Sequence, residues 1–403
     1  MTKFDLRKFT DPDWLRTITP ERLAAFLDPW RPYLISRGFQ LPPPGSGSVD
    51  CEALASVLMA PDATTPPAMV DALYFVHETC SPEDMDELHD KILQKRLSIP
   101  DKPDASPADY AIEVWLFDKD IILEHHAEAL ARRQQSFDYY SGLHGARRKF
   151  PNVTDKVKAK IEAALDSWFA QHRRGRGSRL FVFRHSPTVW LLIRHGEPMR
   201  REAAHQDDGS ADAQFYRPQK HDVLVYDEAN DEIGVSGTTK GEKALYLRVL
   251  GLILFGDEGY FLQKPKYTLE PLVQFGADSL KCDDILGLER VRLVEYRQYW
   301  GGQYKESEVR RAENIFGALA KRKTSQVMSG TPSAAAFKVK FSDSEKERRV
   351  VIRMPSSARY ERNEDCEVIE RWLHARGFII TRDDPEGTDD DADDAPAVLE
   401  DAG

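Results

Sequence analysis

The sequence predicts an α+β protein, with an N-terminal helical bundle followed by a mostly antiparallel α+β domain and a disordered acidic tail. Three observations lead to this prediction. Apolar residues recur at helical spacing up to about residue 172. After Gly175-Arg176-Gly177, short strand-like runs take over. From residue 383 onward the chain carries ten acids and no Lys or Arg. We therefore expect a helical domain at 1–172 with a loop at 40–50, an α+β domain at 178–382, and a disordered tail at 383–403.

Helix-start signals recur through the first half. A hydroxyl residue that can cap free N–H groups is followed by a proline whose missing N–H does no harm there. The Pro/Gly/Ser-rich run at 42–48 predicts a long loop. The capped starts are Thr19-Pro20, Ser81-Pro82 and Ser106-Pro107. A further helix is expected to begin near Thr154.

The second half predicts locally paired strands interrupted by helices. Runs rich in β-branched and aromatic residues alternate with turn residues, which favours a mostly antiparallel sheet. We expect strands at 180–184, 188–193, 222–226, 232–236, 267–272, 291–299, 337–341 and 349–354, and helices at 240–255, at 308–322 and from Asn363 or Asp365 to Gly377.

Length and composition favour a cytoplasmic protein of two or three domains. The chain has 403 residues, of which 41% are hydrophobic and 31% charged. Neither a membrane-spanning apolar run nor a signal peptide is evident. The four cysteines are far apart, which argues against a disulfide framework or a zinc knuckle. We expect a prokaryotic protein that needs no cofactor or metal.

The net charge of −11 comes almost entirely from the tail. Without the ten acids after residue 382, the chain is close to neutral. Like charges with Gly, Pro and small residues cannot bury enough surface to order such a segment. The tail is expected to act as a solubilising segment, and a further hypothesis is that it competes for a basic surface of the same chain.

One motif in the sequence indicates a possible catalytic reaction. The apolar run 189–193 ends in Arg194-His195-Gly196-Glu197, which resembles the opening motif of the histidine phosphatases, the phosphoglycerate mutase superfamily. The resemblance implies that His195 attacks phosphorus while Arg194 holds phosphoryl oxygens. Residues 239–244 are similar to the family's Thr-x-x-Gly-x-x-Gln-Ala helix start, with Lys243 in place of Gln.

Other parts of that family pattern are missing. The motif usually sits on the first strand of its domain, whereas here another strand is expected before it. No later strand ends in His-Gly, since the only histidines after His195 are His205, His221 and His374. The alternative interpretation is a strand end at which Gly196 permits a turn, while Arg194 and His195 face solvent or a partner.

Basic residues gather in the centre of the chain. Such a patch could neutralise phosphates, and His172, Tyr139 and Tyr140 could stack on bases. The alternative is that these cations are solvated helix surfaces and a domain junction. The candidate nucleic-acid-binding residues are Arg147, Arg148, Lys149, Arg173, Arg174, Arg176 and Arg179.

Two functions from different classes remain open. The preferred one is a non-catalytic cytoplasmic interaction or regulatory protein that contacts nucleic acid, or a protein partner, through the basic junction. The competing one is a divergent phosphohydrolase using His195. A concave pocket that joins His195 to another histidine and several arginines would favour the enzyme, and a flat cationic surface would favour the binding protein.

Overall fold

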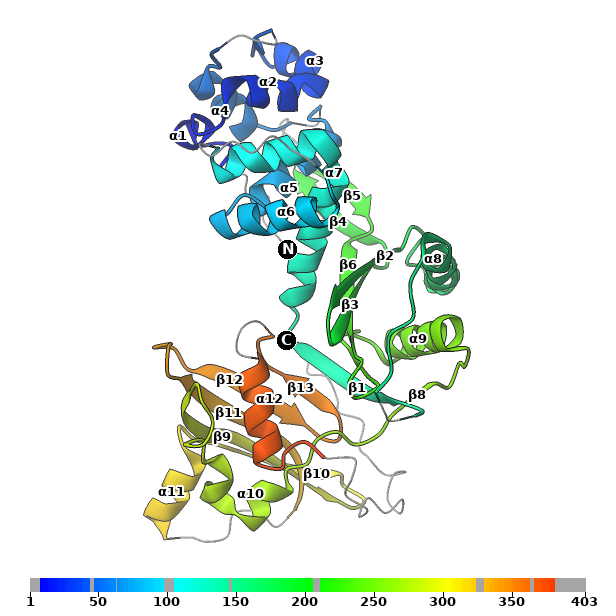
Figure 1. Cartoon of the computed structure of the whole chain (residues 1–403), viewed down its shortest axis with the longest axis vertical. Helices are drawn as coiled ribbons and strands as arrows, with labels where there is room; N and C mark the ends of the chain where they lie inside the picture. The colour runs from blue at the N-terminus through cyan, green and yellow to red at the C-terminus, as the bar shows by residue number, and fades with distance from the viewer. Residues whose placement is uncertain are drawn as a thin grey trace. The chain divides into compact units, whose positions relative to one another are not determined.

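The computed structural model describes residues 8–43, 47–62, 64–97, 105–144, 147–205, 211–323, 330–362 and 366–380. The chain forms two compact units, Met1–Leu130 and Ala131–Gly403 (Figure 1). The predicted α+β class is confirmed, because helices dominate the first unit and an antiparallel sheet organises the second. The acidic tail predicted at 383–403 lies outside the described residues.

The first unit is a bundle of helices around one apolar core. Aromatic contacts help to fill this core: the rings of Phe9 and Trp14 lie 4.8 Å apart, and those of Phe26 and Trp115 lie 6.3 Å apart. The helices are α1 (Pro12–Leu15), α2 (Pro20–Leu27), η1 (Asp28–Trp30), α3 (Arg31–Ser36), α4 (Cys51–Met59), α5 (Pro67–Glu78), α6 (Pro82–Gln94) and α7 (Pro107–Arg132), which runs into the second unit.

The predicted helix starts are confirmed. Proline is the first residue of α2, α6 and α7, and Ser81 forms a capping box with Asp84 at the start of α6. The loop predicted at 40–50 falls between α3 and α4. Helix α7 is interrupted at Asp118, where φ is −158° and ψ is 100°.

The second unit is built on an 11-stranded sheet whose pairs, among the described residues, are all antiparallel. The strand order is β10-β9-β11-β12-β13-β1-β7-β6-β3-β2, with β8 paired to β1. The strands are β1 (Ser136–Gly142), β2 (Arg179–His185), β3 (Thr188–Gly196), β6 (Gln219–Asp227), β7 (Glu232–Val235), β8 (Phe261–Leu262), β9 (Leu288–Gly301), β10 (Glu306–Arg311), β11 (Thr331–Phe341), β12 (Arg348–Arg353) and β13 (Ser357–Arg359).

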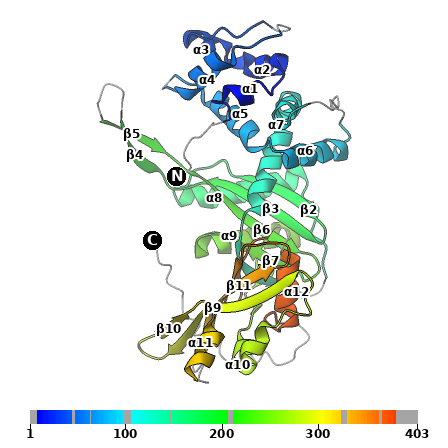
Figure 2. The same ribbon diagram turned by 90° about the vertical axis from the view of Figure 1, so that its left-hand side faces the viewer.

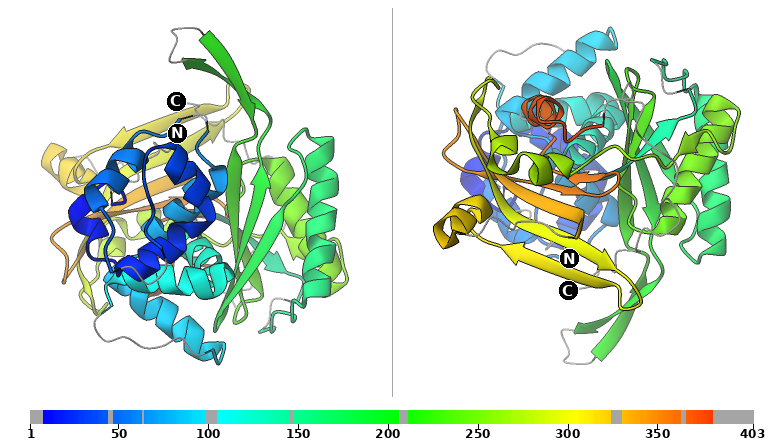
Figure 3. Two further views of the ribbon diagram at one scale, coloured as in Figure 1. Left: turned by 90° about the horizontal axis from the view of Figure 1, so that it is seen from above. Right: turned by 90° about the horizontal axis from the view of Figure 1, so that it is seen from below.

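Two helices cover one face of the sheet at its β2–β3–β6–β7 end (Figure 3). These are α8 (Asp155–Gln171) and α9 (Lys240–Leu250), which continues into η2 (Gly251–Phe255). Leu165 of α8 and Leu245 of α9 bury against Ile193 and Leu224 of the sheet. A separate hairpin of β4 (Arg200–His205) and β5 (Ala211–Tyr216) projects from this end as an arm (Figure 3).

The opposite face of the sheet is covered at its β9–β11–β12 end. The rings of Phe337 on β11 and Trp372 on α12 (Cys366–Ala375) lie 5.3 Å apart, and Phe378 completes the aromatic cluster. The remaining elements of this end are α10 (Glu270–Gln274), η3 (Gly276–Leu280) and α11 (Ile315–Arg322).

The structure differs from the sequence prediction at the domain boundary. The units divide at residues 130 and 131, before the expected boundary near 172. The reason is that β1 pairs with β13 and β7 in the middle of the sheet, and α8 buries Phe169 against the same sheet.

Two element predictions are wrong. The helix expected at 308–322 begins only at Ile315, because residues 306–311 pair with β9 as strand β10. The strand expected at 267–272 is reduced to one bridge, Tyr267 with Ile379, followed by α10.

No helix in the described part of the chain is both long enough and apolar enough to cross a membrane.

Candidate functional site

Strand alternation separates the two residues of the histidine motif. Successive side chains of β3 point to opposite faces of the sheet. Ile193 and His195 face α8 and α9, where the imidazole of His195 stacks on Phe169 with ring centroids 4.2 Å apart. Arg194 therefore lies on the other face, beside its cross-strand partner Arg179. The structure does not bring Arg194 and His195 into one phosphate pocket.

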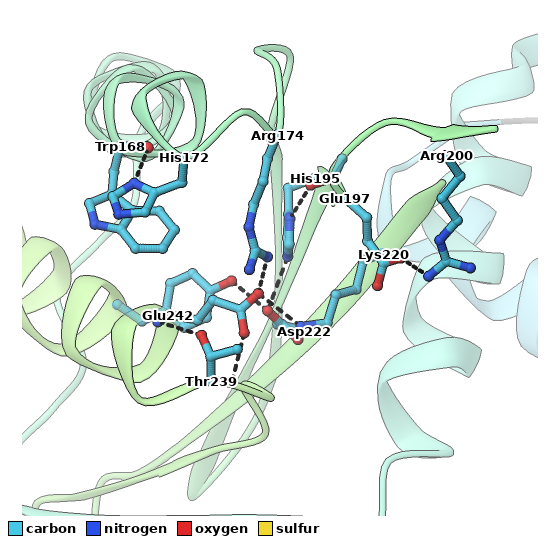
Figure 4. Close-up of polar contacts among 12 residues, drawn as sticks. Trp168, His172, Arg174, His195, Glu197, Arg200, Lys220, Asp222, Thr239 and Glu242 are labelled. Atoms are coloured by element: carbon cyan, nitrogen blue, oxygen red, sulfur yellow. Dashed lines mark hydrogen bonds and ion pairs between the residues drawn. The ribbon is translucent and has the colours of Figure 1, made fainter. Parts of the chain in front are cut away.

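His195 is enclosed and both of its ring nitrogens are engaged (Figure 4). Its exposure is 3%. Nε2 lies 3.0 Å from Oδ2 of Asp222, and Nδ1 lies 3.0 Å from the carbonyl oxygen of Gly196. Both partners are acceptors, so both hydrogen bonds form only when the ring carries two protons. In that state His195 has no lone pair with which to attack phosphorus.

The residues around His195 form a network of buried charges, which we call the His195 cluster: His195, Asp222, Lys220, Glu242 and Arg174. The ammonium of Lys220 bridges the two acids, 3.2 Å from Asp222 and 2.9 Å from Glu242. Arg174 pairs with Glu242 from the other side. Each buried carboxylate thus has a cationic partner, as burial of a charge requires.

Both acids of the His195 cluster stay ionised more readily than usual. Burial opposes ionisation of Asp222, but the hydrogen bond to His195 and the charge of Lys220 outweigh it, so the pKa of Asp222 is lowered. Burial and the charge of Asp222 oppose ionisation of Glu242, but the hydrogen bond from Lys220, the backbone hydrogen bond from Thr239 and the charge of Lys220 together outweigh them and lower the pKa of Glu242. Glu242 also belongs to the capping box of α9, through Thr239.

The cluster has the donor types of a metal site. The ligand atoms of His195, Asp222 and Glu242 lie within 4.8 Å of one another. The Lys220 ammonium already lies between the two carboxylates, so a metal ion would have to displace that charge. The arrangement fits an internal ion-pair network better than a metal centre.

This network anchors the loop at 173–179, which we call the basic loop. Arg174 reaches inward to Glu242, and Asp166 of α8 accepts backbone N–H bonds from Gly177 and Ser178, both 2.8 to 3.0 Å long. Gly196 is required by this packing, since a Cβ there would lie 2.5 Å from the carbonyl oxygen of Arg174. In this structure the glycine of the histidine motif permits a close approach between backbones.

The predicted basic residues have different surroundings. Arg174 is committed to the His195 cluster, and Arg148 lies over the rings of Phe255 and Tyr260 at 5.2 and 5.1 Å. Arg179 lies 3.5 Å from Glu162. The predicted cations with exposed side chains are Arg147, Lys149, Arg173, Arg176 and Arg179.

Helix α8 separates the two groups of predicted cations. Residues 147–149 precede the helix and residues 173–179 follow it. At 1.5 Å per residue, its length of 17 residues holds the two ends roughly 25 Å apart. The two predicted basic segments therefore lie at opposite ends of α8.

The aromatic residues predicted to stack on bases are mostly packed inside the protein. Tyr139 is 8% exposed, and burial followed by the charge of Asp138 raises the pKa of Tyr140 to about 12. His172 is exposed, but its ring stacks on Trp168 with centroids 3.6 Å apart.

A larger basic surface, which the sequence reasoning missed, lies on the sheet itself. The register places cations from five adjacent strands on the face opposite Phe337 and Trp372. We call this surface the cationic face, and its residues are Arg290, Arg292, Arg297, Arg311, Lys338, Lys340, Arg349, Arg353 and Arg359.

Like charges stand directly opposite one another on the cationic face. Arg290 pairs in register with Lys340, and Lys338 lies between Arg292 on one side and Arg349 on the other. Such cross-strand pairs are destabilising. Side chains here reach solvent, with exposures of 55% for Arg290 and 59% for Arg349.

Three acids offset part of this charge. Glu295 pairs with Arg311 and Arg349, and Glu313 lies 3.3 Å from Lys338. Glu347 pairs with Arg290 and Arg292; burial opposes its ionisation, but Arg292 and then Arg290 outweigh this and lower the pKa of Glu347. A cationic excess remains among the described residues.

One end of the cationic face is hollowed into an open groove of about 570 Å³. It lies where β9 and β11 meet the β11–β12 turn. Charged side chains line it: Arg290, Arg292, Lys338, Lys340, Glu345, Lys346 and Glu347.

No protein-family model matches this chain, and no curated protein matches its sequence.

Proposed function

We propose that this chain is a non-catalytic interaction or regulatory protein that binds nucleic acid through the cationic face. The observation that carries the proposal is the row of like charges held in register across β9, β11 and β12. A fold that keeps cations opposite one another gives up stability, and a polyanion laid over them would recover it by neutralising the repulsion.

Phosphates suit this surface in both number and spacing. Neighbouring strands are about 4.8 Å apart and alternate residues of one strand about 6.8 Å apart, so the cations form a grid over a broad area. Guanidinium groups match phosphate geometry, and most cations of this face are arginines. Binding through such a grid is expected to be weakly sequence-specific and strongly salt-dependent.

The basic loop supports the same function as a secondary contact. Arg173 and Arg176 are exposed there, and the backbone carbonyl of Arg173 accepts a hydrogen bond from the exposed Arg217 at the base of the β4–β5 arm. Arg174 is excluded from this role, since its guanidinium pairs with a buried carboxylate. These residues place a smaller cationic area on another part of the second unit.

The phosphohydrolase using His195 is the second candidate. The proximity of His195 to two carboxylates is the observation in its favour, and the enclosure of the ring weighs against it. We expect purified protein to show no hydrolysis of a generic phosphomonoester above background. Turnover that disappears in His195→Ala would reverse the ranking.

We place the protein in the cytoplasm as part of this proposal. All four cysteines are free thiols, and three of them are buried, which suits a reducing compartment. The prokaryotic origin stays a prediction.

The proposal is tested by removing cations from the cationic face. We choose Arg290, Lys340, Arg353 and Arg359 for joint replacement by alanine, since none is a core residue. Binding of a fluorescent 20-nucleotide strand, followed by anisotropy at low salt, should weaken at least tenfold.

A matched control removes the same number of exposed cations elsewhere in the second unit. Its positions are Lys240, Arg248, Lys264 and Arg371. This control should bind within about twofold of the unchanged protein. Equal losses in both variants would mean that net charge alone governs binding, and absence of binding by the unchanged protein would remove the proposal.

A further inference from the structure

We infer that the nucleic acid bound by the cationic face is single-stranded, with unpaired bases stacking on aromatic side chains at the β9–β10 hairpin. This inference rests on the proposed function and adds the class of ligand. Three observations lead to it: the position of Tyr299, the exposure of the hairpin turn, and the small residue Ala334 between two arginines.

Tyr299 shares the cationic face. It lies two residues beyond Arg297 on β9, and it pairs with Ser307 as Arg297 pairs with Val309. Residues two apart on a strand point to the same face. The rows of cations therefore end at an aromatic ring.

The turn beyond Tyr299 exposes further aromatic surface. Tyr304 is 88% exposed and Trp300 is 44% exposed. Gly301 and Gly302 have positive φ angles of 69° and 73°, which shape the turn and carry no side chain to cover the rings. Figure 2 shows this hairpin extending away from α12. No described residue of this chain buries Tyr304.

One small residue lies between cations of neighbouring strands. Ala334 of β11, which is partly exposed, lies in register with Arg353 on β12 and with Arg297 on β9. A methyl group rises much less from the sheet than an arginine does, so a phosphate placed over Ala334 can reach cations on both sides.

Exposed aromatic rings select unpaired bases. In a duplex, each base is covered above and below by its neighbours, so its face is closed to a side chain. In a single strand, the base faces are free, and stacking of one base on an aromatic ring raises the affinity about fivefold or more. Cations alone would attract either form, and the aromatic end of the face favours the single strand.

The inference is tested by comparing two probes on the full chain. One is a labelled 20-nucleotide oligothymidine, which does not pair with itself, and the other is a labelled 20-base-pair duplex. At the same salt concentration, we expect the single strand to bind at least tenfold more tightly. Equal or tighter binding of the duplex would overturn the inference while leaving the proposed function intact.

Aromatic variants identify the contact. Tyr299→Ala combined with Tyr304→Ala should weaken binding of the single strand at least fivefold, since each lost stack costs about that much or more. Duplex binding should change less than twofold. Tyr299→Phe with Tyr304→Phe keeps both rings and should restore binding. Phe275→Ala removes a ring that is 60% exposed beside α10 and should have no effect.

The outcomes separate the two claims. Equal loss of single-strand and duplex binding in the double alanine variant, or no loss at all, would contradict stacking at the hairpin. Failure of the unchanged protein to bind either probe would overturn both this inference and the proposed function. Binding of heparin with neither probe bound would indicate an acidic partner of another class, and would also overturn both.

Discussion

At the scale of single residues, Glu242 shows how the sequence motif and the structure diverge. In the sequence it belongs to a stretch that resembles a phosphatase helix start. In the structure it caps α9 through Thr239 and pairs with Lys220 and Arg174. In this structure Glu242 therefore both caps helix α9 and balances the charges of Lys220 and Arg174.

Glu242→Gln should destabilise the second unit by about 3–5 kcal/mol, since it leaves buried cations without their partner. Glutamine can still close the capping box, so the loss of stability measures the contribution of the Glu242 charge. Chemical denaturation measures it, with the exposed Glu258→Gln as control. A loss no larger than that of the control would show that the ion pairs contribute nothing.

The pH dependence of this effect has a defined sign. The pKa of Glu242 is lower in the folded chain than its ordinary value of 4.5, so the unfolded chain binds more protons between the two values. The contribution of Glu242 to stability is therefore complete above pH 4.5 and is lost as the pH falls through the folded value. The stability difference between the unchanged protein and Glu242→Gln should shrink below pH 4.5. A difference that stays constant down to pH 3 would contradict the lowered pKa.

Gly196 gives a second prediction at this scale. Gly196→Ala puts a methyl group 2.5 Å from the Arg174 carbonyl oxygen, which forces the basic loop to move and should cost about 1–3 kcal/mol. Gly47→Ala is the control, because nothing lies within 4 Å of that Cβ position. Thermal melting of the two variants makes the comparison, and an unchanged melting temperature for Gly196→Ala would mean that the loop has room to move.

At the scale of elements, local signals predicted the helices well and the sheet only in part. Hydroxyl caps and prolines predicted the starts of α6 and α7 because those signals act within one turn. At α2 the hydroxyl of Thr19 donates to Asp109 and does not cap the helix, so the proline alone marks that start. Strand β1 (Ser136–Gly142) was missed because its pairing partners β13 and β7 are distant in sequence. The first half of the helix predicted at 308–322 is wrong because residues 306–311 pair with β9 as the second strand of a local hairpin.

The sequence could not predict the cationic face, because this surface depends on the order of the strands in the sheet. Strand β11 shows ordinary alternation of cation and apolar residue over Phe337-Lys338-Val339-Lys340-Phe341. Alternation predicts one solvent-facing side for each strand. Only the order β10-β9-β11-β12-β13 adds these sides into one surface. Cations that are close together along the chain, such as those at 173–179, are easier to recognise in the sequence. Helix α8 separates these residues from 147–149.

At the scale of the whole molecule, charge is distributed unevenly along a chain of net charge −11. Cations are concentrated on one face of the second unit, and acids are concentrated after residue 382. Opposite charges on one chain compete with an external polyanion for the same surface.

Deletion of residues 383–403 should therefore tighten nucleic-acid binding severalfold at low salt and leave the melting temperature within about 1 °C. Anisotropy titrations and thermal melts of the full and shortened chains provide the comparison. Weaker binding after deletion would show that the tail assists the interaction, and a melting temperature several degrees lower would show that it packs on the folded units.

Photochemical cross-linking followed by peptide mapping shows directly whether nucleic acid lies on the cationic face. A single-stranded probe carrying photoreactive thymidines is irradiated with the full chain, and the attached peptides are identified by mass spectrometry. We expect cross-links within 288–311, 331–341 and 348–359, which contain the strands of the cationic face. Cross-links confined to 147–149 and 173–179, or distributed evenly over the chain, would contradict this expectation.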